Sequence, residues 1–366
     1  MVADFLRDNG LMTVPTRWIN PLQPPENHRM RLGKPADERR ATRMPSEAAL
    51  EALPKVFLMV TASADVLVSS ITAILCAAPD RISEVLCLPA DCEVRQKRGR
   101  ADEDAYGLRR RPAKGATAMV KWIVPSMSCV VEAAVGKIRR LNDEAREIAR
   151  WYEQNPAQVY LPAEMEYLRT KEWLSPDEME GVVFAEPVSP ELPVKWCTKN
   201  GIARQRRGRK AYMRFADLEA AVLRELPPGF PSVDKATGLK YGDALFVTQR
   251  NALDSSKPRF RCVIEPVKYS QIRIRLGAAS ANGNYSIFDH CGFYEPDGSS
   301  IHVNTHQFRH YLNTLAQAGG LSQLDIANCP VARMSGRTCT MVMKRPMPWL
   351  HVSGRLSPTT RACSVR

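Results

Sequence analysis

Apolar residues recur at helical spacing along the first half of the chain, and the strongest such pattern lies in residues 66–78. We predict a helix there, ended by Pro79, because one buried stripe is formed by Val66, Leu67, Ser70, Ile71, Ile74, Leu75 and Ala78. The preceding segment MPSEAALEAL predicts a helix with Ser46 as its N-cap and with a buried side of Ala48, Leu50 and Leu53. Residues 81–86 predict a third, short helix.

A longer amphipathic pattern over residues 131–152 predicts one continuous helix with a buried face of Ile138, Leu141, Ala145, Ile148 and Ala149. Before it, residues 106–124 predict a β-hairpin with its turn at Lys114 and Gly115. Near the end, residues 300–303 predict a short strand, and residues 305–318 predict a helix with Thr305 as the N-cap. Together these patterns predict an α+β fold that is mainly helical and contains a small antiparallel sheet.

Proline and charge divide the chain into segments. Residues 1–44 are rich in proline and predict an arm or linker, whereas residues 45–152 and 285–327 predict the two parts of one packed domain. Residues 153–284 predict an insertion that contains an acidic helix over 175–183, a segment around Trp196, a basic turn and a helix over 215–226. Residues 328–366 carry seven Lys and Arg but no Asp or Glu, which predicts a disordered tail of a different composition class.

Composition excludes several classes of protein. With 366 residues, of which 44% are hydrophobic and 25% charged, the chain is neither disordered nor fibrous. Its longest apolar stretch, residues 66–78, is shorter than the roughly 18 residues that a membrane span needs. The first residues, MVADFLRDNG, lack the basic flank and apolar run of a secretory signal, so we expect a cytoplasmic protein that does not bind a membrane. The ten cysteines are expected to be reduced thiols that bind no metal, since Cys87 and Cys92, the closest pair, have no histidine nearby.

The formal net charge of +13 favours a polyanionic partner, first of all nucleic acid. Two basic stretches, residues 95–111 and 204–214, hold much of this charge. The second stretch contains glycines and is therefore expected to form a turn or wing, with candidate DNA-binding residues Arg204, Arg206, Arg207, Arg209 and Lys210. For each stretch, a solvated surface without a partner is the alternative.

His306 and Arg309 lie three residues apart near a predicted helix start, so both side chains should lie on one face and suit a phosphate oxygen. The surrounding THQFRHYLNTLAQAG resembles the box II motif of the tyrosine recombinases of the phage-integrase family. ILCAAPDRISEVLCLPADCEV resembles box I of the same family, and RRPAKGATAMVKWIVPS resembles its β2–β3 turn. The three motifs occur in the order that the family has.

This resemblance implies a DNA breaking-rejoining catalytic domain that binds double-stranded DNA and exchanges strands without a metal or another cofactor. It implies catalytic roles for Arg81, Lys114, His306 and Arg309 and supporting roles for Glu84 and His310. Two arginines would contact the non-bridging phosphate oxygens, Lys114 would protonate the leaving 5′ oxygen, and His306 would act as general acid–base near the nucleophile. A homotetrameric synapse is also implied by the family.

The family's nucleophilic tyrosine is missing. At its expected place this chain has Thr340 and Met341, and no tyrosine follows Tyr311. The resemblance ends at Ala327, where acidic residues also cease, so we infer a frameshift and expect the chain as written to be catalytically inactive. Read one frame over, the coding DNA can encode a tyrosine across positions 340 and 341; a gene sequence without that tyrosine would contradict the inference.

Two other functions stay open. One is a non-enzymatic DNA-binding regulator that recognises DNA with the basic insertion, whose order of elements resembles a winged helix-turn-helix of the excisionase kind. For the fold of this insertion, a lid subdomain with a basic surface is the alternative. The other is an enzyme of the type IB topoisomerase kind, which would share the chemistry and equally lack its tyrosine. Two sets of substitutions distinguish the regulator from the recombinase: charge reversal at Arg206, Arg207 and Arg209, and charge removal at Arg81 and Arg309. The set that abolishes DNA binding identifies the interface.

Overall fold

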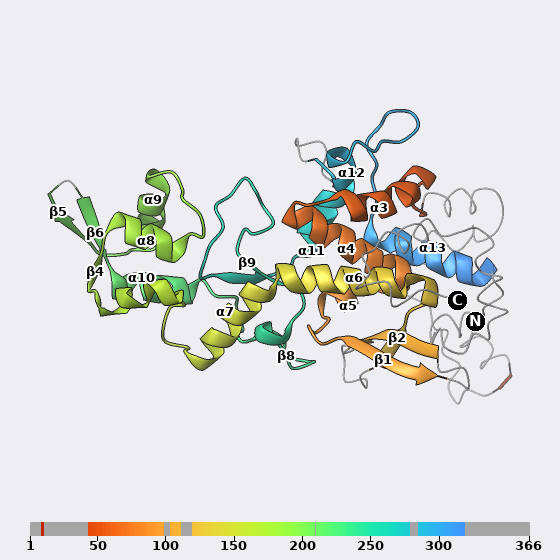
Figure 1. Ribbon diagram of the computed structural model, residues 1–366, viewed down its shortest axis with the longest axis horizontal. Coiled ribbons are helices and arrows are strands. Elements are labelled where there is room, and N and C mark those ends of the chain that lie inside the picture. Colours follow the sequence, from red (N-terminus) through yellow and green to blue (C-terminus); the bar gives the residue numbers. More distant parts are fainter. Residues whose placement is uncertain are drawn as a thin grey trace. The chain divides into compact units, whose positions relative to one another are not determined.

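The computed structural model describes residues 9–10, 43–98, 103–110, 119–208, 210–278 and 285–318. The chain divides into two units, Met1–Met44 and Pro45–Arg366, and the helices and strands below all belong to the second (Figure 1). The predicted arm lies outside the described residues except for residues 9–10 and 43–44, and the predicted tail over 328–366 lies wholly outside them. Within the described ranges, no helix has both the length and the apolar character to span a bilayer.

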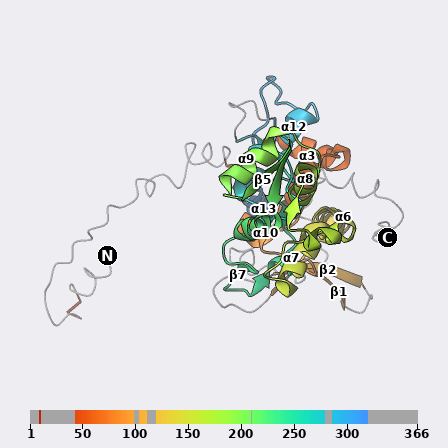
Figure 2. The same cartoon turned by 90° about the vertical axis from the view of Figure 1, so that its left-hand side faces the viewer.

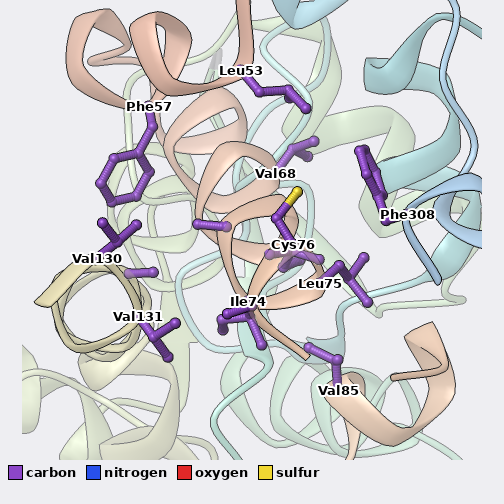
Figure 3. Close-up of a cluster of buried hydrophobic side chains, with 14 of the residues drawn as sticks. Leu53, Phe57, Val68, Ile74, Leu75, Cys76, Val85, Val130, Val131 and Phe308 are labelled. Carbon is purple, nitrogen blue, oxygen red and sulfur yellow. The ribbon is translucent and has the colours of Figure 1, made fainter. Parts of the chain in front are cut away.

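Helix α4 (Ser63–Ala77) forms the centre of the first hydrophobic cluster. It is packed on nearly all sides, by α3 (Glu47–Met59), α6 (Pro125–Leu141) and α13 (Thr305–Ala318) among others. Figure 3 shows Phe57 of α3, Val130 of α6 and Phe308 of α13 around it. The helix predicted over residues 66–78 is confirmed, although its buried surface is wider than one stripe.

The helices on either side of α4 along the chain also begin as predicted. Ser46 Oγ accepts a hydrogen bond of 3.1 Å from the backbone N–H of Ala49, which makes Ser46 the N-cap of α3. In α3, Leu53 is buried whereas Ala48 and Leu50 are only partly buried. After Pro79, Arg81 is the N-cap residue of the short α5 (Ile82–Leu86).

The single helix predicted over residues 131–152 is wrong, because the structure has two helices, α6 and α7 (Asp143–Gln154), that meet at Asn142. Asn142 has φ −108° and ψ 6°, which departs from helical geometry. Its buried side-chain amide donates a hydrogen bond of 2.8 Å to the Leu245 carbonyl. As a result Ile138 packs in the first cluster and Ala145 in the third, while Leu141 between them is 37% exposed.

A three-stranded antiparallel sheet in the order β1-β2-β3 contains the predicted hairpin. Its strands β2 (Glu103–Arg110) and β3 (Met119–Trp122) pair Gly107 with Trp122 and Leu108 with Lys121. A Cβ atom on Gly107 would lie 2.8 Å from Val120 Cγ1, so glycine permits this close approach of the strands. The basic stretch 95–111 gave no indication of β1 (Glu93–Arg98), which pairs with β2. The general prediction of an α+β fold with a small antiparallel sheet is confirmed.

Residues 159–222 form most of a second hydrophobic cluster. Its second three-stranded antiparallel sheet has the order β4-β6-β5, and Figures 1 and 2 show this sheet with its neighbouring helices. The elements of this part are η2 (Ala163–Thr170), β4 (Trp173–Leu174), α8 (Pro176–Val183), α9 (Glu191–Lys199), β5 (Arg204–Arg207), β6 (Lys210–Arg214) and α10 (Phe215–Arg224). The predicted acidic helix is α8, with Ser175 as its N-cap, and the predicted closing helix is α10.

The rest of the chain returns to the first cluster. It does so through β7 (Ser232–Asp234), β8 (Leu239–Lys240), η3 (Tyr241–Asp243), β9 (Val247–Gln249), β10 (Ile264–Pro266), α11 (Tyr269–Arg273), η4 (Ile274–Ala278) and α12 (Ile287–His290). Residues of the predicted insertion, such as Leu245 and Ile272, thus belong to the same hydrophobic cluster as α4. The strand predicted over residues 300–303 is wrong, since the segment makes only a bridge between Ser300 and Tyr294.

The packing of α13 on α4 can be tested by replacing Phe308 with Ala. Phe308 is 1% exposed, so its removal should lower the free energy of unfolding by about 3–5 kcal/mol. Urea unfolding of the two proteins measures the difference. Tyr294→Ala removes an aromatic ring that is 50% exposed and serves as the control. Equal stability of Phe308→Ala and wild type would contradict this packing.

Candidate functional site

The predicted catalytic residue Arg81 lies at the start of α5, directly after the turn that leaves α4. Its Nη1 donates a hydrogen bond of 3.0 Å to Glu84 Oε1, and its backbone N–H donates one of 3.2 Å to Glu84 Oε2. The Arg81 side chain is nevertheless 60% exposed. Glu84 therefore orients the guanidinium, while much of the Arg81 side chain stays open to solvent.

Glu84 is held in its charged form. Its partial burial raises the pKa, but the hydrogen bond from the Arg81 backbone and the charges of Lys121 and Arg81 outweigh this, so that the pKa lies below its ordinary value. At neutral pH a carboxylate anion thus stands beside the Arg81 guanidinium.

Three residues that the sequence did not single out hold the turn between α4 and α5 in place. Asp80, whose side chain is fully buried, forms an ion pair with Arg110 of β2, which is 4% exposed. Lys121 of β3 lies 2.6 Å from the other carboxylate oxygen of Asp80 and 3.5 Å from Glu84 Oε2. The hairpin is therefore attached by charge to the turn that carries Arg81. A short Pro-Asp-Arg sequence before a helix was the available signal for Asp80, but nothing in a run of three arginines marked Arg110 as the buried one.

The predicted His306 and Arg309 lie in the first turns of α13, with His306 exposed and Arg309 half-buried. The prediction of Thr305 as N-cap is wrong by one position: Thr305 is buried, and Asn304 Oδ1 accepts hydrogen bonds from the backbone N–H groups of His306 (3.0 Å) and Gln307 (3.1 Å). Asparagine is the stronger cap of the two residue types. Because these two amides are already bonded, an anion here would depend on side chains. His310, a predicted supporting residue, is exposed on the same helix.

Both halves of the predicted site are attached to the same helix. α5 and α13 each contact α4. In Figure 3, Leu75 of α4 points to the side on which Val85 of α5 and Phe308 of α13 lie, and all three belong to the first cluster. Arg81 and Arg309 each lie within four residues of one of these anchors. The predicted Lys114 lies outside the described residues. Among the described lysines, Lys121 occupies the hairpin next to Arg81.

The predicted DNA-binding residues of the insertion form a separate group on the second cluster. Arg204, Arg206 and Arg207 are exposed along β5, and Lys210 of β6 is exposed with Asp177 at 3.7 Å. Arg209 lies outside the described residues. The β5–β6 hairpin that carries these residues packs through Met213, which is buried in the second cluster. Val85 and Phe308, which lie close in sequence to Arg81 and Arg309, belong to the first cluster.

All ten tyrosines lie in the described ranges, at or before Tyr311. Tyr106, Tyr152 and Tyr241 are buried, and burial raises the pKa of each phenol. Within the described ranges no cluster of three or more His, Cys, Asp or Glu side chains is arranged to bind a metal ion.

Replacing either Asp80 by Asn or Arg110 by Met should lower the free energy of unfolding by about 3–5 kcal/mol. The first change leaves the buried Arg110 guanidinium without its carboxylate, and the second leaves the buried Asp80 carboxylate with Lys121 alone. The double variant should lose clearly less than the sum of the two. Urea unfolding of the four proteins gives the coupling. The pair Glu191 and Lys195, which is 77% and 72% exposed, is the control and should show no measurable coupling. Additive losses at Asp80 and Arg110 would mean that the two charges do not interact.

Glu84→Gln should destabilise the protein at neutral pH, and the difference from wild type should shrink under acid. A carboxylate whose pKa is lowered by folding contributes stability above its unfolded pKa, near 4.5, and loses it as the pH falls through the lower folded value. Thermal unfolding at pH 7 and at about pH 3 measures this. The matched control is Glu51→Gln, at an exposed carboxylate of α3 without an ion pair to any described residue. A difference that stays constant with pH would show that Glu84 does not act as a charged partner.

The arrangement presents an exposed arginine whose plane is set by a charged carboxylate, with a lysine beside it and a second arginine and a histidine on a helix packed against the same core. Guanidinium groups fixed in this way can hold the oxygens of a phosphate by paired hydrogen bonds. Comparisons of the chain with models of protein families, with curated proteins and with solved structures find no match.

Proposed function

We propose that this chain is a DNA-binding protein descended from a tyrosine site-specific recombinase, and that its core holds a phosphodiester of double-stranded DNA without cleaving it. Arg81 and Arg309 contact the non-bridging oxygens in this proposal. His306 and Lys114 take the places of the general acid–base and of the acid for the leaving oxygen.

The observation that carries the proposal is the orientation of Arg81 by Glu84. A surface arginine without a function usually moves freely, because fixing a long side chain costs conformational entropy. Here Glu84 binds both the backbone and the guanidinium of Arg81, while the side chain stays 60% exposed. The packing of α5 and α13 on α4 adds support, since it attaches the second arginine to the same rigid helix.

In this proposal the protein binds DNA but does not cleave it, because the covalent nucleophile is missing. Strand exchange without a metal needs a side chain that stores the phosphodiester energy in a covalent bond. The chain has no tyrosine after Tyr311, so recombinase ancestry is proposed together with catalytic inactivity.

A regulator that binds DNA with the insertion is the second candidate. It is favoured by a specific observation: Arg204 and Arg206 are exposed on β5 and form no ion pair with any described residue. Exposed cations without partners are available to phosphates at no cost of breaking an internal pair.

The proposal predicts that the purified full chain binds duplex DNA, with an association constant that falls linearly with salt on logarithmic axes. Arg81→Ala/Arg309→Ala should weaken binding by about tenfold or more, whereas Lys240→Ala/Lys268→Ala, which removes the same charge elsewhere on the surface, should change it little. Fluorescence anisotropy with a labelled duplex measures both.

On a nicked suicide substrate, the same protein should form no adduct that survives denaturing electrophoresis. A covalent protein–DNA product would overturn the proposed inactivity. Equal binding by the Arg81/Arg309 variant and wild type would overturn the proposed phosphate contact and leave the insertion as the interface.

A further inference from the structure

The surface formed by α9 and the β5–β6 hairpin has a strong and local excess of positive charge. Residues 191–214 contain eight Lys and Arg but a single acid, Glu191. The neighbouring helices carry acidic residues, namely Asp177, Glu178 and Glu180 on α8 and Asp217 and Glu219 on α10. The excess is therefore confined to one helix and one hairpin rather than spread over the insertion.

Helix α9 has one buried and one exposed face. Pro193, Trp196 and Cys197 are buried against the second cluster, which fixes how the helix is rotated. The opposite face carries Val194, which is 42% exposed, together with the exposed Lys195, Thr198 and Lys199. Positions 194, 195, 198 and 199 follow helical spacing, so these four side chains point the same way.

This exposed face suits the edges of base pairs. Lysine donates to guanine O6 and N7, threonine can donate or accept, and a small apolar side chain can contact the thymine methyl group. Lys195 pairs with the exposed Glu191 at 2.7 Å, and Thr198 Oγ1 donates a hydrogen bond of 2.9 Å to the Val194 carbonyl, so both side chains would exchange these partners for bases. An α-helix fits the major groove of B-form DNA. The deep and narrow major groove of A-form RNA would exclude it.

The hairpin is joined to α9 in a fixed way. Only four residues separate Lys199 from Arg204, with Gly201 at φ +66° in the left-handed region that favours glycine. The Ile202 N–H donates a hydrogen bond of 3.0 Å to the Cys197 carbonyl, and Ile202 is buried in the second cluster. The position of β5 is thus set by the end of α9.

The three arginines of β5 are available to a ligand, whereas Lys210 of β6 lies 3.7 Å from Asp177. Arg204 and Arg206 make no ion pair with a described residue. Arg207 donates to Gln205 Oε1 at 2.9 Å and lies 5.1 Å from the ring centroid of Tyr212, so that its side chain is held without being neutralised. Contacts to phosphates position a protein on the duplex, whereas contacts to base edges specify the sequence.

We propose that α9 and the β5–β6 hairpin form a second DNA-binding surface, on which Val194, Lys195, Thr198 and Lys199 read base edges in the major groove and Arg204, Arg206 and Arg207 hold the flanking phosphates. This rests on the proposed function in that the partner is duplex DNA, but it assigns sequence recognition to a site apart from Arg81 and Arg309. The connection between α8 and α9, residues 184–190, is longer than the three or four residues typical of a helix-turn-helix. It is anchored instead by the bridge between Phe184 and Phe260 and by the hydrogen bond from Val188 N–H to Glu180 Oε1.

The test uses the full chain and selection from a pool of random duplexes, followed by anisotropy on the selected and on an unrelated duplex. Arg204→Ala/Arg206→Ala/Arg207→Ala should weaken binding to both duplexes alike and reduce the salt slope by about three. Thr198→Ala/Lys199→Ala should instead lower the preference for the selected duplex by about tenfold or more, with a small effect on the unrelated one. Lys240→Ala/Lys257→Ala/Lys268→Ala removes three charges from elsewhere and is the control for net charge.

Three outcomes would overturn this inference. They are a selection without any preferred sequence, equal binding of duplex RNA, and hairpin variants that bind like the charge control. If hairpin variants bind normally while Arg81→Ala/Arg309→Ala does not bind, the inference fails and the proposed function stands. If neither the wild type nor any variant binds duplex DNA, the inference and the proposed function both fail. Circular dichroism of each variant shows whether a loss reflects unfolding.

Discussion

The burial of α4 on nearly all of its faces is the constraint on which the rest of the main packed region depends. A helix surrounded in this way cannot shift without opening the core, because protein interiors are packed to crystal-like density. Helices α3, α5, α6, α12 and α13 all contact it. The turn that leaves its C-terminal end therefore has a fixed position, and Arg81 begins the next helix directly after that turn.

Hydrophobic packing positions the helices of the candidate site, and electrostatic contacts then orient its side chains. The hydrophobic contacts of Val85 and Phe308 place two helices on α4 but do not orient a guanidinium group. Orientation comes from Glu84, and the position of the hairpin comes from the buried Asp80, which binds Arg110 and Lys121 together. The candidate phosphate site thus combines a rigid apolar support with charged groups that compensate one another, so that one exposed arginine remains available.

Local patterns in the sequence predicted the elements whose cause is local. The helix α4, the Ser46 cap of α3 and the β2–β3 hairpin are each contained within about 20 residues, and all three are confirmed. The break between α6 and α7 was missed because its partner, the Leu245 carbonyl, lies 103 residues away. β1 was missed because its polar sequence becomes a strand only through pairing with β2. For the candidate site, the motif predicted Arg81 and Glu84, which the structure places in contact, but the burial of Arg110 depends on the fold and cannot be read from an arginine run.

The buried pair of Asp80 and Arg110 also limits which substitutions the protein can accept during evolution. Exposed positions such as Arg81, whose side chain is 60% exposed, can change one at a time at little cost in stability. The two buried charges cannot, because a lineage that loses one of them passes through a protein about 3–5 kcal/mol less stable, a large share of the margin of an ordinary domain. Related genes should therefore retain both charges or have replaced both, and the turn that carries Arg81 should keep its shape even where Arg81 itself has changed.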